Sequence, residues 1–398
     1  EVLFPPHQGA VRPPVGDKPG PVSGVDGEGG ELLLRPRVQV AHPVQQHQAG
    51  EPGRPGQGPE EAEHLLPKLP PAPLRPRRAH DPACAARTAR EHTGIHMDAL
   101  QKLLFQRAAV RGETVVLHDE FSRSVEHQHL PLAVRRLAGE VTASALLAAA
   151  ALEFDGTVLL QIAGDGPIKL LVAEVRPGLL FRVSVTMRED AGEISADAGM
   201  TELVNAGGRG RCALILDQTG RDPDTQPYQG VVSLAGETFA EAMTNYFATS
   251  EQVETKIKLA SDESGVGGLM LQKMPLLGGK ALPEDFDEEG WQRLKIFADT
   301  VKSEELLTLD PEEINRRLFW EESPNVTLEA RPEFKCRCSD EGVRSMILSL
   351  GREEAEAIIA ERGSIDITCH FCGQVRSFDS ADVASLFAGA PAQPRTLN

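Results

Sequence analysis

The segments "FKCRCSD" (residues 334–340) and "ITCHFCGQ" (residues 367–374) hold four of the six cysteines of this 398-residue chain. Cys336 and Cys338 form a Cys-x-Cys pair, and Cys369 and Cys372 form a Cys-x2-Cys pair. Two close pairs at such a separation are the usual way to build a tetrahedral four-thiolate zinc site, because each pair brings two sulfurs to one ion. Four free thiols or two disulfides are the alternative. Four protein ligands leave no open position, so the expected Zn²⁺ is structural.

The chain between the two pairs suits a small metal module. We expect Ser339 to cap a first helix and Gly363 to end a second one, followed by a hairpin around the Cys369–Cys372 knuckle. His370 lies inside the knuckle and is expected on the surface, because four thiolates already complete the shell. A module of this size has little core of its own, so much of its folding free energy would come from the metal.

The same four cysteines are suited to redox chemistry. Zinc-bound thiolates remain nucleophilic, and peroxide and hypochlorous acid attack thiolates. Cys336–Cys338 and Cys369–Cys372 could each close into a small disulfide loop. Oxidation would then release the metal and unfold the module.

Composition divides the chain sharply near Met97. Residues 1–96 contain 17 of the 29 prolines and show neither helical nor strand periodicity. We expect this leader to lie outside the folded protein, as an over-extended reading frame or as a disordered tail. The remaining residues hold 30 basic and 48 acidic side chains, which is the entire net charge of −18. Such an acidic body repels phosphate backbones and disfavours nucleic acid as a partner.

The sequence also argues against a membrane protein. Its longest uncharged apolar helix candidate, Val141–Leu152, is too short to cross a bilayer, and the N-terminus lacks a signal-peptide pattern. Six cysteines are too few for a disulfide scaffold, so we expect a reducing, cytoplasmic setting.

Residues 97–281 are expected to form an α+β domain. The predicted helices are "MDALQKLLFQ" (97–106), the segment 130–154 and the segment 236–252, which would start near Glu237. Strand-like runs cover 156–164, 167–175, 179–187, 211–218 and 228–235, in the order of a meander.

Residues 282–333 are expected to form a helical linker. Between 283 and 333 there are 15 acidic and 6 basic residues, together with both tryptophans. Asp310 followed by Pro311 predicts a capped helix start. Short helices with such charged outer faces must lie on another surface, and we expect Trp291, Phe297, Phe319 and Trp320 to cover apolar side chains there.

Other candidate sites are weak. Gly265–Gly268 lacks the Lys-Ser/Thr of a phosphate loop and predicts a turn. His118, His127 and His129 are expected as surface or partly buried helix residues, Cys212 as a small buried hydrophobe, and Cys84 as part of the leader. Because no catalytic arrangement of side chains stands out, we predict no enzyme activity.

The chain from Met97 to about Phe387 resembles the family of redox-regulated heat-shock proteins of thirty-three kilodaltons. The likeness rests on "RRLAGE", "GDGPIKLLVAE", "YQGVVSLAGETFAEAMTNYFATSEQ", "GLMLQKMP" and the cysteine pairs. It implies an α/β substrate-binding domain with an antiparallel sheet (97–281), a helical linker (282–333), a zinc-binding redox-switch domain (334–387) and a tail (388–398). It further implies that Cys336, Cys338, Cys369 and Cys372 are both zinc ligands and redox switch.

The resemblance also implies a function. Members of the family are silent when reduced and become ATP-independent holdases for unfolding client proteins, as homodimers, when oxidised. The leader is the main departure from the family pattern. The alternative is a zinc-ribbon adaptor or nucleic-acid-binding module on an α+β domain, which the charge balance disfavours.

Overall fold

The computed structural model describes residues 98–152, 155–220, 222, 226–275 and 285–389. The described residues belong to one compact unit of the chain. The predictions for the leader (1–96), with Cys84, and for most of the tail fall outside them.

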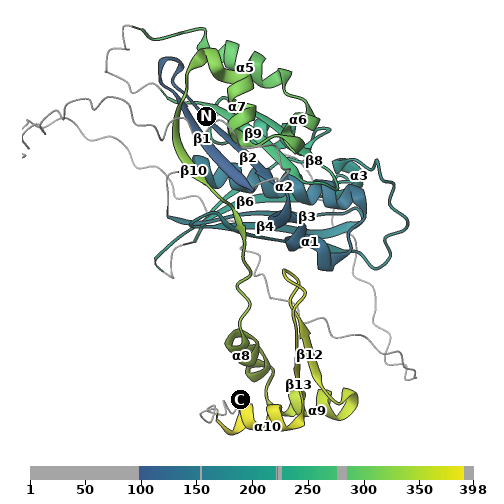
Figure 1. Cartoon of the computed structure of the whole chain (residues 1–398). Helices are drawn as coiled ribbons and strands as arrows, with labels where there is room; N and C mark the ends of the chain where they lie inside the picture. Colours follow the sequence, from purple (N-terminus) through teal and green to yellow (C-terminus); the bar gives the residue numbers. More distant parts are fainter. Residues whose placement is uncertain (1–97, 153–154, 221, 223–225, 276–284, 390–398) are drawn as a thin grey trace, which may run out of the picture. The chain divides into compact units, whose positions relative to one another are not determined.

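Two sheets make up the body of the molecule (Figure 1). The five-stranded sheet has the order β10-β1-β2-β9-β8, and the six-stranded sheet has the order β11-β5-β4-β3-β6-β7. Neighbouring strands are antiparallel throughout, except that β11 runs parallel to β5. The strands are β1 (Ala99–Phe105), β2 (Val110–Leu117), β3 (Gly156–Ala163), β4 (Ile168–Arg176), β5 (Leu180–Met187), β6 (Arg211–Gln218), β7 (Tyr228–Val232), β8 (Thr255–Ser261), β9 (Val266–Lys273), β10 (Asn325–Ala330) and β11 (Glu333–Phe334).

The long helix α2 (Leu132–Ala151) packs against strands of both sheets. It is buried on nearly all sides, and its many alanines let the two sheets approach closely. At Gly139, a Cβ atom would lie 2.2 Å from the Ser261 Oγ, so only glycine fits there. Within the described residues, no helix combines the length and apolarity needed to span a membrane.

Shorter helices and turns complete the body. They are the 3₁₀ turns η2 (Gln106–Ala108) and η3 (Glu126–Gln128) and the helices α1 (Asp119–Val125), α3 (Met200–Val204) and α4 (Phe239–Thr249). The cap of α4 is Thr238, whose Oγ1 accepts from the Glu241 amide at 3.2 Å, one residue beyond the predicted start at Glu237.

The predicted helix at 97–106 is wrong, because residues 99–105 form β1. Leu100, Leu103 and Leu104 fit a helical face, but a short apolar run fits a buried strand equally well. Pairing with β2 on one side and β10 on the other decides the outcome. Long-range hydrogen bonding thus overrides the local pattern.

The linker helices lie on the face of the five-stranded sheet opposite α2. They are α5 (Gly290–Thr300), α6 (Ser303–Thr308) and α7 (Pro311–Phe319), followed by the 3₁₀ turn η4 (Trp320–Glu322). The predicted cap holds, since Asp310 Oδ1 accepts from the Glu313 amide at 2.8 Å. Trp291 and Phe319 are buried as predicted, and Phe297 is partly buried.

Trp320 does not cover apolar surface as predicted, because 68% of the residue is exposed. Phe319 and Trp320 are consecutive, and consecutive side chains at a helix end point in directions about 100° apart. Only one of the two can face the sheet, and Phe319 does so by packing edge-on against Phe105 with the ring centroids 5.1 Å apart.

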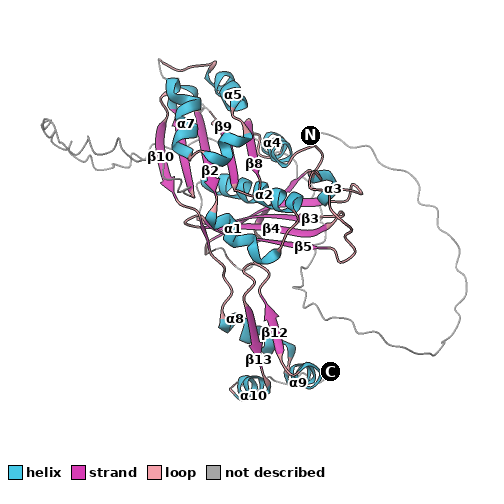
Figure 2. Cartoon of the chain, turned by 45° about the vertical axis from the view of Figure 1, so that its right-hand side comes forward, coloured by secondary structure: helices cyan, strands magenta, loops and turns pink. Residues whose placement is uncertain are grey.

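The C-terminal helices and strands are labelled in Figure 2. They have an apolar cluster of their own. They are α8 (Asp340–Leu350), α9 (Arg352–Arg362), β12 (Ile365–Thr368), β13 (Val375–Phe378) and α10 (Ser380–Ala388). Ser339 caps α8 and Gly363 ends α9 at a φ of 83°, both as predicted. The α+β fold class is therefore confirmed, whereas the domain boundaries given above stay predictions.

A glycine of β9 allows the linker to lie close to the sheet, which gives a testable prediction. A Cβ on Gly267 would stand 2.1 Å from the Leu306 backbone oxygen in α6. Gly267→Ala should therefore lift α6 and destabilise the linker by about 1–3 kcal/mol. Trp291 of α5 is buried against the sheet, so a red shift of its fluorescence at lower urea would report the loss.

Gly192→Ala is the matched control, because no atom lies within 4 Å of a Cβ built there. Equal urea midpoints for the two variants would contradict the close approach of α6 to β9.

Candidate metal centre

Two separate segments carry the cysteine pairs. Cys336 and Cys338 follow β11 and precede α8, whereas Cys369 and Cys372 lie in the turn that joins β12 to β13. The turn is closed by the Cys369 amide, which donates to the Gln374 oxygen at 3.0 Å, and by the Gly373 amide, which donates to the Cys369 oxygen at 2.8 Å. Gly373 has a φ of 67°, a left-handed conformation that favours glycine, so a glycine here relieves strain in the turn.

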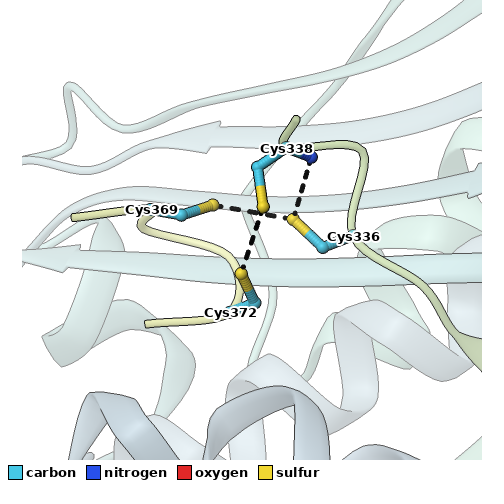
Figure 3. A group of neighbouring side chains, drawn as sticks. All are labelled: Cys336, Cys338, Cys369 and Cys372. Atoms are coloured by element: carbon cyan, nitrogen blue, oxygen red, sulfur yellow. Dashed lines mark hydrogen bonds between the residues drawn. The ribbon is translucent and has the colours of Figure 1, made fainter. Parts of the chain in front are cut away.

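The four cysteine sulfurs converge (Figure 3). All four Sγ atoms lie within 4.8 Å of one another. A tetrahedron with Zn–S distances of about 2.3 Å requires sulfurs about 3.8 Å apart. The array therefore has the size and donor set of a four-thiolate shell, and it could hold a metal ion.

The shortest sulfur–sulfur distances join the two segments. Cys336 Sγ lies 3.6 Å from Cys369 Sγ, and Cys338 Sγ lies 3.4 Å from Cys372 Sγ. The disulfides predicted on oxidation lie instead within each segment, Cys336–Cys338 and Cys369–Cys372. That pairing stays a prediction, because it concerns the chain after the shell has opened.

The ionisation of the thiols differs across the array. Burial opposes ionisation of Cys336, but hydrogen bonds from the Cys338 amide and the neighbouring thiols outweigh it and lower its pKa to about 7. Burial, reinforced by the neighbouring thiols, raises the pKa of Cys372 to about 12. The protein alone thus stabilises one thiolate, at Cys336. Several thiolates so close together repel one another and need a cation between them. A divalent metal ion supplies such a charge.

Sequence reasoning missed an aromatic contact beside the shell. Phe371, between the two ligands of the knuckle, stacks on Arg182 of β5, with the guanidinium carbon 4.0 Å from the ring centroid. Arg182 Nη2 donates to Glu174 Oε2 of β4 at 2.6 Å, and Arg337 Nε lies 3.6 Å from Glu174 Oε1. Arg337 lies between Cys336 and Cys338 and contacts the buried Glu174 carboxylate directly. The other cysteine segment reaches the same carboxylate through the stacking of Phe371 on Arg182.

Further contacts involve backbone oxygens near the cysteines. Arg176 Nη2 donates to the Lys335 oxygen at 2.7 Å, and His127 Nε2 lies 3.3 Å from the His370 oxygen. For the stacking of Phe371 on Arg182, the sequence gives one signal, which is an aromatic residue between two cysteines. It indicates a partner but cannot identify an arginine almost 190 positions earlier in the chain.

The remaining candidate residues lie elsewhere. Cys212 is buried in β6, as predicted, and burial raises its pKa to about 12. His129 and His370 are exposed and His127 is partly buried, as expected.

The prediction that His118 is a surface or partly buried residue is wrong, because its side chain is buried. Its Nδ1 lies 3.0 Å from the Ser264 oxygen in the turn between β8 and β9. In that turn, Asp262 Oδ1 accepts from the Ser264 and Gly265 amides. The turn predicted over Gly265–Gly268 is therefore right only for Gly265, because Gly267 and Gly268 lie in β9.

Comparison with known proteins agrees with this architecture. The family described as Hsp33 protein matches residues 98–379. The 33 kDa chaperonin of Methylobacillus flagellatus is 38% identical over 291 residues, covering 73% of this chain and 94% of that protein. The 33 kDa chaperonin of Pseudomonas aeruginosa is 39% identical over 300 residues, covering 75% of this chain and 97% of that protein.

A crystal structure of the 33 kDa chaperonin from Thermotoga maritima has the same fold. The TM-score is 0.60 at 21% sequence identity, covering 74% of this chain and 98% of that one. From the extent of the family match and the identity to these relatives, the chain belongs to the Hsp33 family.

Proposed function

We propose that this chain is a redox-regulated, ATP-independent holdase that keeps unfolding proteins from aggregating during oxidative stress. In this proposal it acts in the cytoplasm, has no enzymatic activity, binds neither nucleic acid nor membranes, and forms a homodimer when oxidised. Family membership supports the general role, because the relatives are named chaperonins. The redox control rests on this chain's own cysteines.

One observation carries the proposal: the cysteine shell is joined almost directly to the linker, whose helices cover an apolar sheet face. Only residues 331–335 separate the end of β10 from Cys336, and two of them form β11. Loss of the shell would therefore act on the linker over a very short length of chain.

The covered face is strongly apolar. On the sheet side the cluster includes Leu103, Phe105, Val116, Leu269 and Leu271. On the linker side it includes Trp291, Leu294, Leu306, Ile314 and Phe319. Burying one such side chain is worth roughly 1.5–3 kcal/mol, and the same surface would bind apolar segments of other proteins once uncovered.

The linker also contains charge that favours its release. Nine more acidic than basic residues lie between 283 and 333, and crowding like charges against the body costs free energy. Lys256 of β8 offsets part of this cost, since its Nζ lies 2.5 Å from Asp299 Oδ1 of α5. Docking of the linker is therefore a balance between apolar burial and charge crowding, which loss of an anchor can shift.

In the reduced chain, Cys336, Cys338, Cys369 and Cys372 would hold Zn²⁺. A bound Zn²⁺ ion would supply the positive charge that keeps four sulfurs ionised in one shell. Peroxide would oxidise two of these thiolates to one disulfide, and the two electrons removed, together with two protons from solvent, would convert one peroxide molecule into two waters. Two disulfides per chain would leave no thiolate ligands, and the small cluster of the C-terminal elements would then lack its cross-link.

The first prediction concerns metal content. The reduced chain should bind one zinc ion, and X-ray absorption should find four sulfurs and no nitrogen or oxygen in the first shell. Cys372→Ser should weaken zinc binding by ~100-fold or more, because one thiolate is lost. Cys212→Ala is the matched control and should bind zinc normally, since Cys212 is buried in β6 of the six-stranded sheet and is not part of the shell. Nitrogen or oxygen ligands would contradict the assigned shell.

The second prediction concerns the switch. Peroxide-treated protein without ATP should suppress light scattering by a heat-unfolding client, and the reduced protein should not. Cys369→Ser and Cys372→Ser should destabilise the shell and become active at lower peroxide. Cys212→Ala should keep the normal threshold, because Cys212 is buried in β6 and is not one of the four clustered cysteines.

These outcomes separate the candidate functions. Equal suppression in both states would remove the switch, and no suppression in either would remove the chaperone assignment. A zinc-ribbon adaptor, the alternative predicted from the sequence, would keep its zinc and its fold in peroxide.

A further inference from the structure

The strand β10 is weakly embedded in the sheet to which it belongs. Residues 325–329 are all exposed, and only Ala330 is partly buried. Val326 and Leu328 are 51% and 41% exposed, although apolar side chains in a half-buried strand are normally covered. The attachment of β10 thus depends mainly on its main chain, which pairs with β1 at the edge of the five-stranded sheet.

The pairing with β1 is itself imperfect. Lys102 pairs with Leu328 and Leu103 with Val326, so the register shifts and Thr327 has no partner residue. Such a bulge disrupts the ladder of hydrogen bonds locally. Two side-chain hydrogen bonds support the ladder: Gln101 Nε2 donates to Glu329 Oε1 at 3.0 Å, and Thr327 Oγ1 donates to the Lys102 oxygen at 3.2 Å. The strand is therefore replaceable at low cost.

The edge beneath β10 borders apolar surface. Leu103 and Phe105 of β1 belong to the cluster that the linker helices cover. A strand edge with unpaired N–H and C=O groups is a template for another extended segment. A segment that binds this edge through its main chain needs no particular side chains. The strand β10 is an example, because it pairs with β1 although nearly all of its residues are exposed.

We propose that the edge of β1 is a binding site for an extended, apolar segment of an unfolding protein, and that β10 occupies this site in the present structure. The inference rests on the proposed function, because release of the linker is what frees β10. It adds how a client is bound: the client replaces β10 as the outermost strand, while its apolar residues reach the neighbouring cluster. In the present structure β10 thus takes the place of a client strand, and five residues separate its end from Cys336.

The edge strand β7 of the other sheet provides an internal comparison. It exposes Tyr228 and Val231, so it too presents apolar side chains at a sheet edge. No linker strand covers it among the described residues, and it lies far from the cysteines in sequence. A client that merely adhered to exposed apolar strands would bind β7 as readily as β1.

The first experiment uses the full chain with a benzoylphenylalanine photo-crosslinker at Leu104 of β1 or, as matched control, at Gln229 of β7. A heat-unfolding client is added to reduced or oxidised protein, and light scattering is followed in the same samples. Crosslinking to the client from position 104 should rise at least fivefold on oxidation, with little change at position 229. Equal crosslinking at both positions, or crosslinks only between copies of the chain, would overturn the inference while leaving suppression of scattering intact.

The second experiment tests the main chain directly with a peptide copy of residues 323–331. One peptide is N-methylated at the residues whose amides face β1, and its twin is methylated at those that face solvent. Oxidised protein should bind the unmodified peptide and the twin similarly, and the first methylated peptide at least tenfold more weakly. Equal binding of both methylated forms would overturn strand pairing. If the oxidised, unmodified chain failed to suppress scattering at all, the proposed function would fall and the inference with it.

Discussion

Four sulfur atoms from two segments thirty residues apart must meet within 4.8 Å, and the C-terminal elements depend on this requirement. The apolar cluster of these elements contains only six buried residues, of which Phe378 is the largest. A core of that size gives little stability by itself. Four thiolates around one metal ion would contribute on the order of 10 kcal/mol or more, so under the proposed function sulfur chemistry would control whether this part of the chain is folded.

In the proposed switch the linker would transmit that control, because it packs on one sheet and pairs with the other. Its helices bury Leu294, Ile314 and Phe319 against the five-stranded sheet, while β11 pairs with β5 of the other sheet. A polar chain ties helix and strand together: Thr114 Oγ1 donates to Asn315 Oδ1 at 2.6 Å, and Asn315 Nδ2 donates to Gln101 Oε1 at 2.9 Å. Gln101 in turn holds Glu329 of β10. Displacing β10 therefore removes a hydrogen bond from the network that also positions α7.

Features decided by residues close together in the sequence were predicted well, whereas features decided by distant residues were not. The convergence of the four cysteines and the helix caps at Asp310 and Ser339 follow from local spacing, and the structure has all of these features. That the four cysteines hold zinc stays a prediction. The strands β1 and β10 were missed because their identity depends on each other, and they are more than two hundred residues apart. Trp320 was misplaced because an amphipathic pattern does not show where a helix ends. The contact between Arg182 and Phe371 has no local signature at all.

Glu174 shows how the cysteine site and the body are coupled electrostatically. Its carboxylate is almost fully buried, and burying a charge without partners is costly. Arg182 of β5 and Arg337 of the Cys336–Cys338 segment both approach it, and the guanidinium of Arg182 also stacks on the ring of Phe371. Arg337 and Phe371 each lie between two cysteines, so a change in either pair moves a residue that helps neutralise or cover this carboxylate. The free energy of the sulfur shell and that of the body are therefore linked through one buried charge, in addition to the short connection through β11.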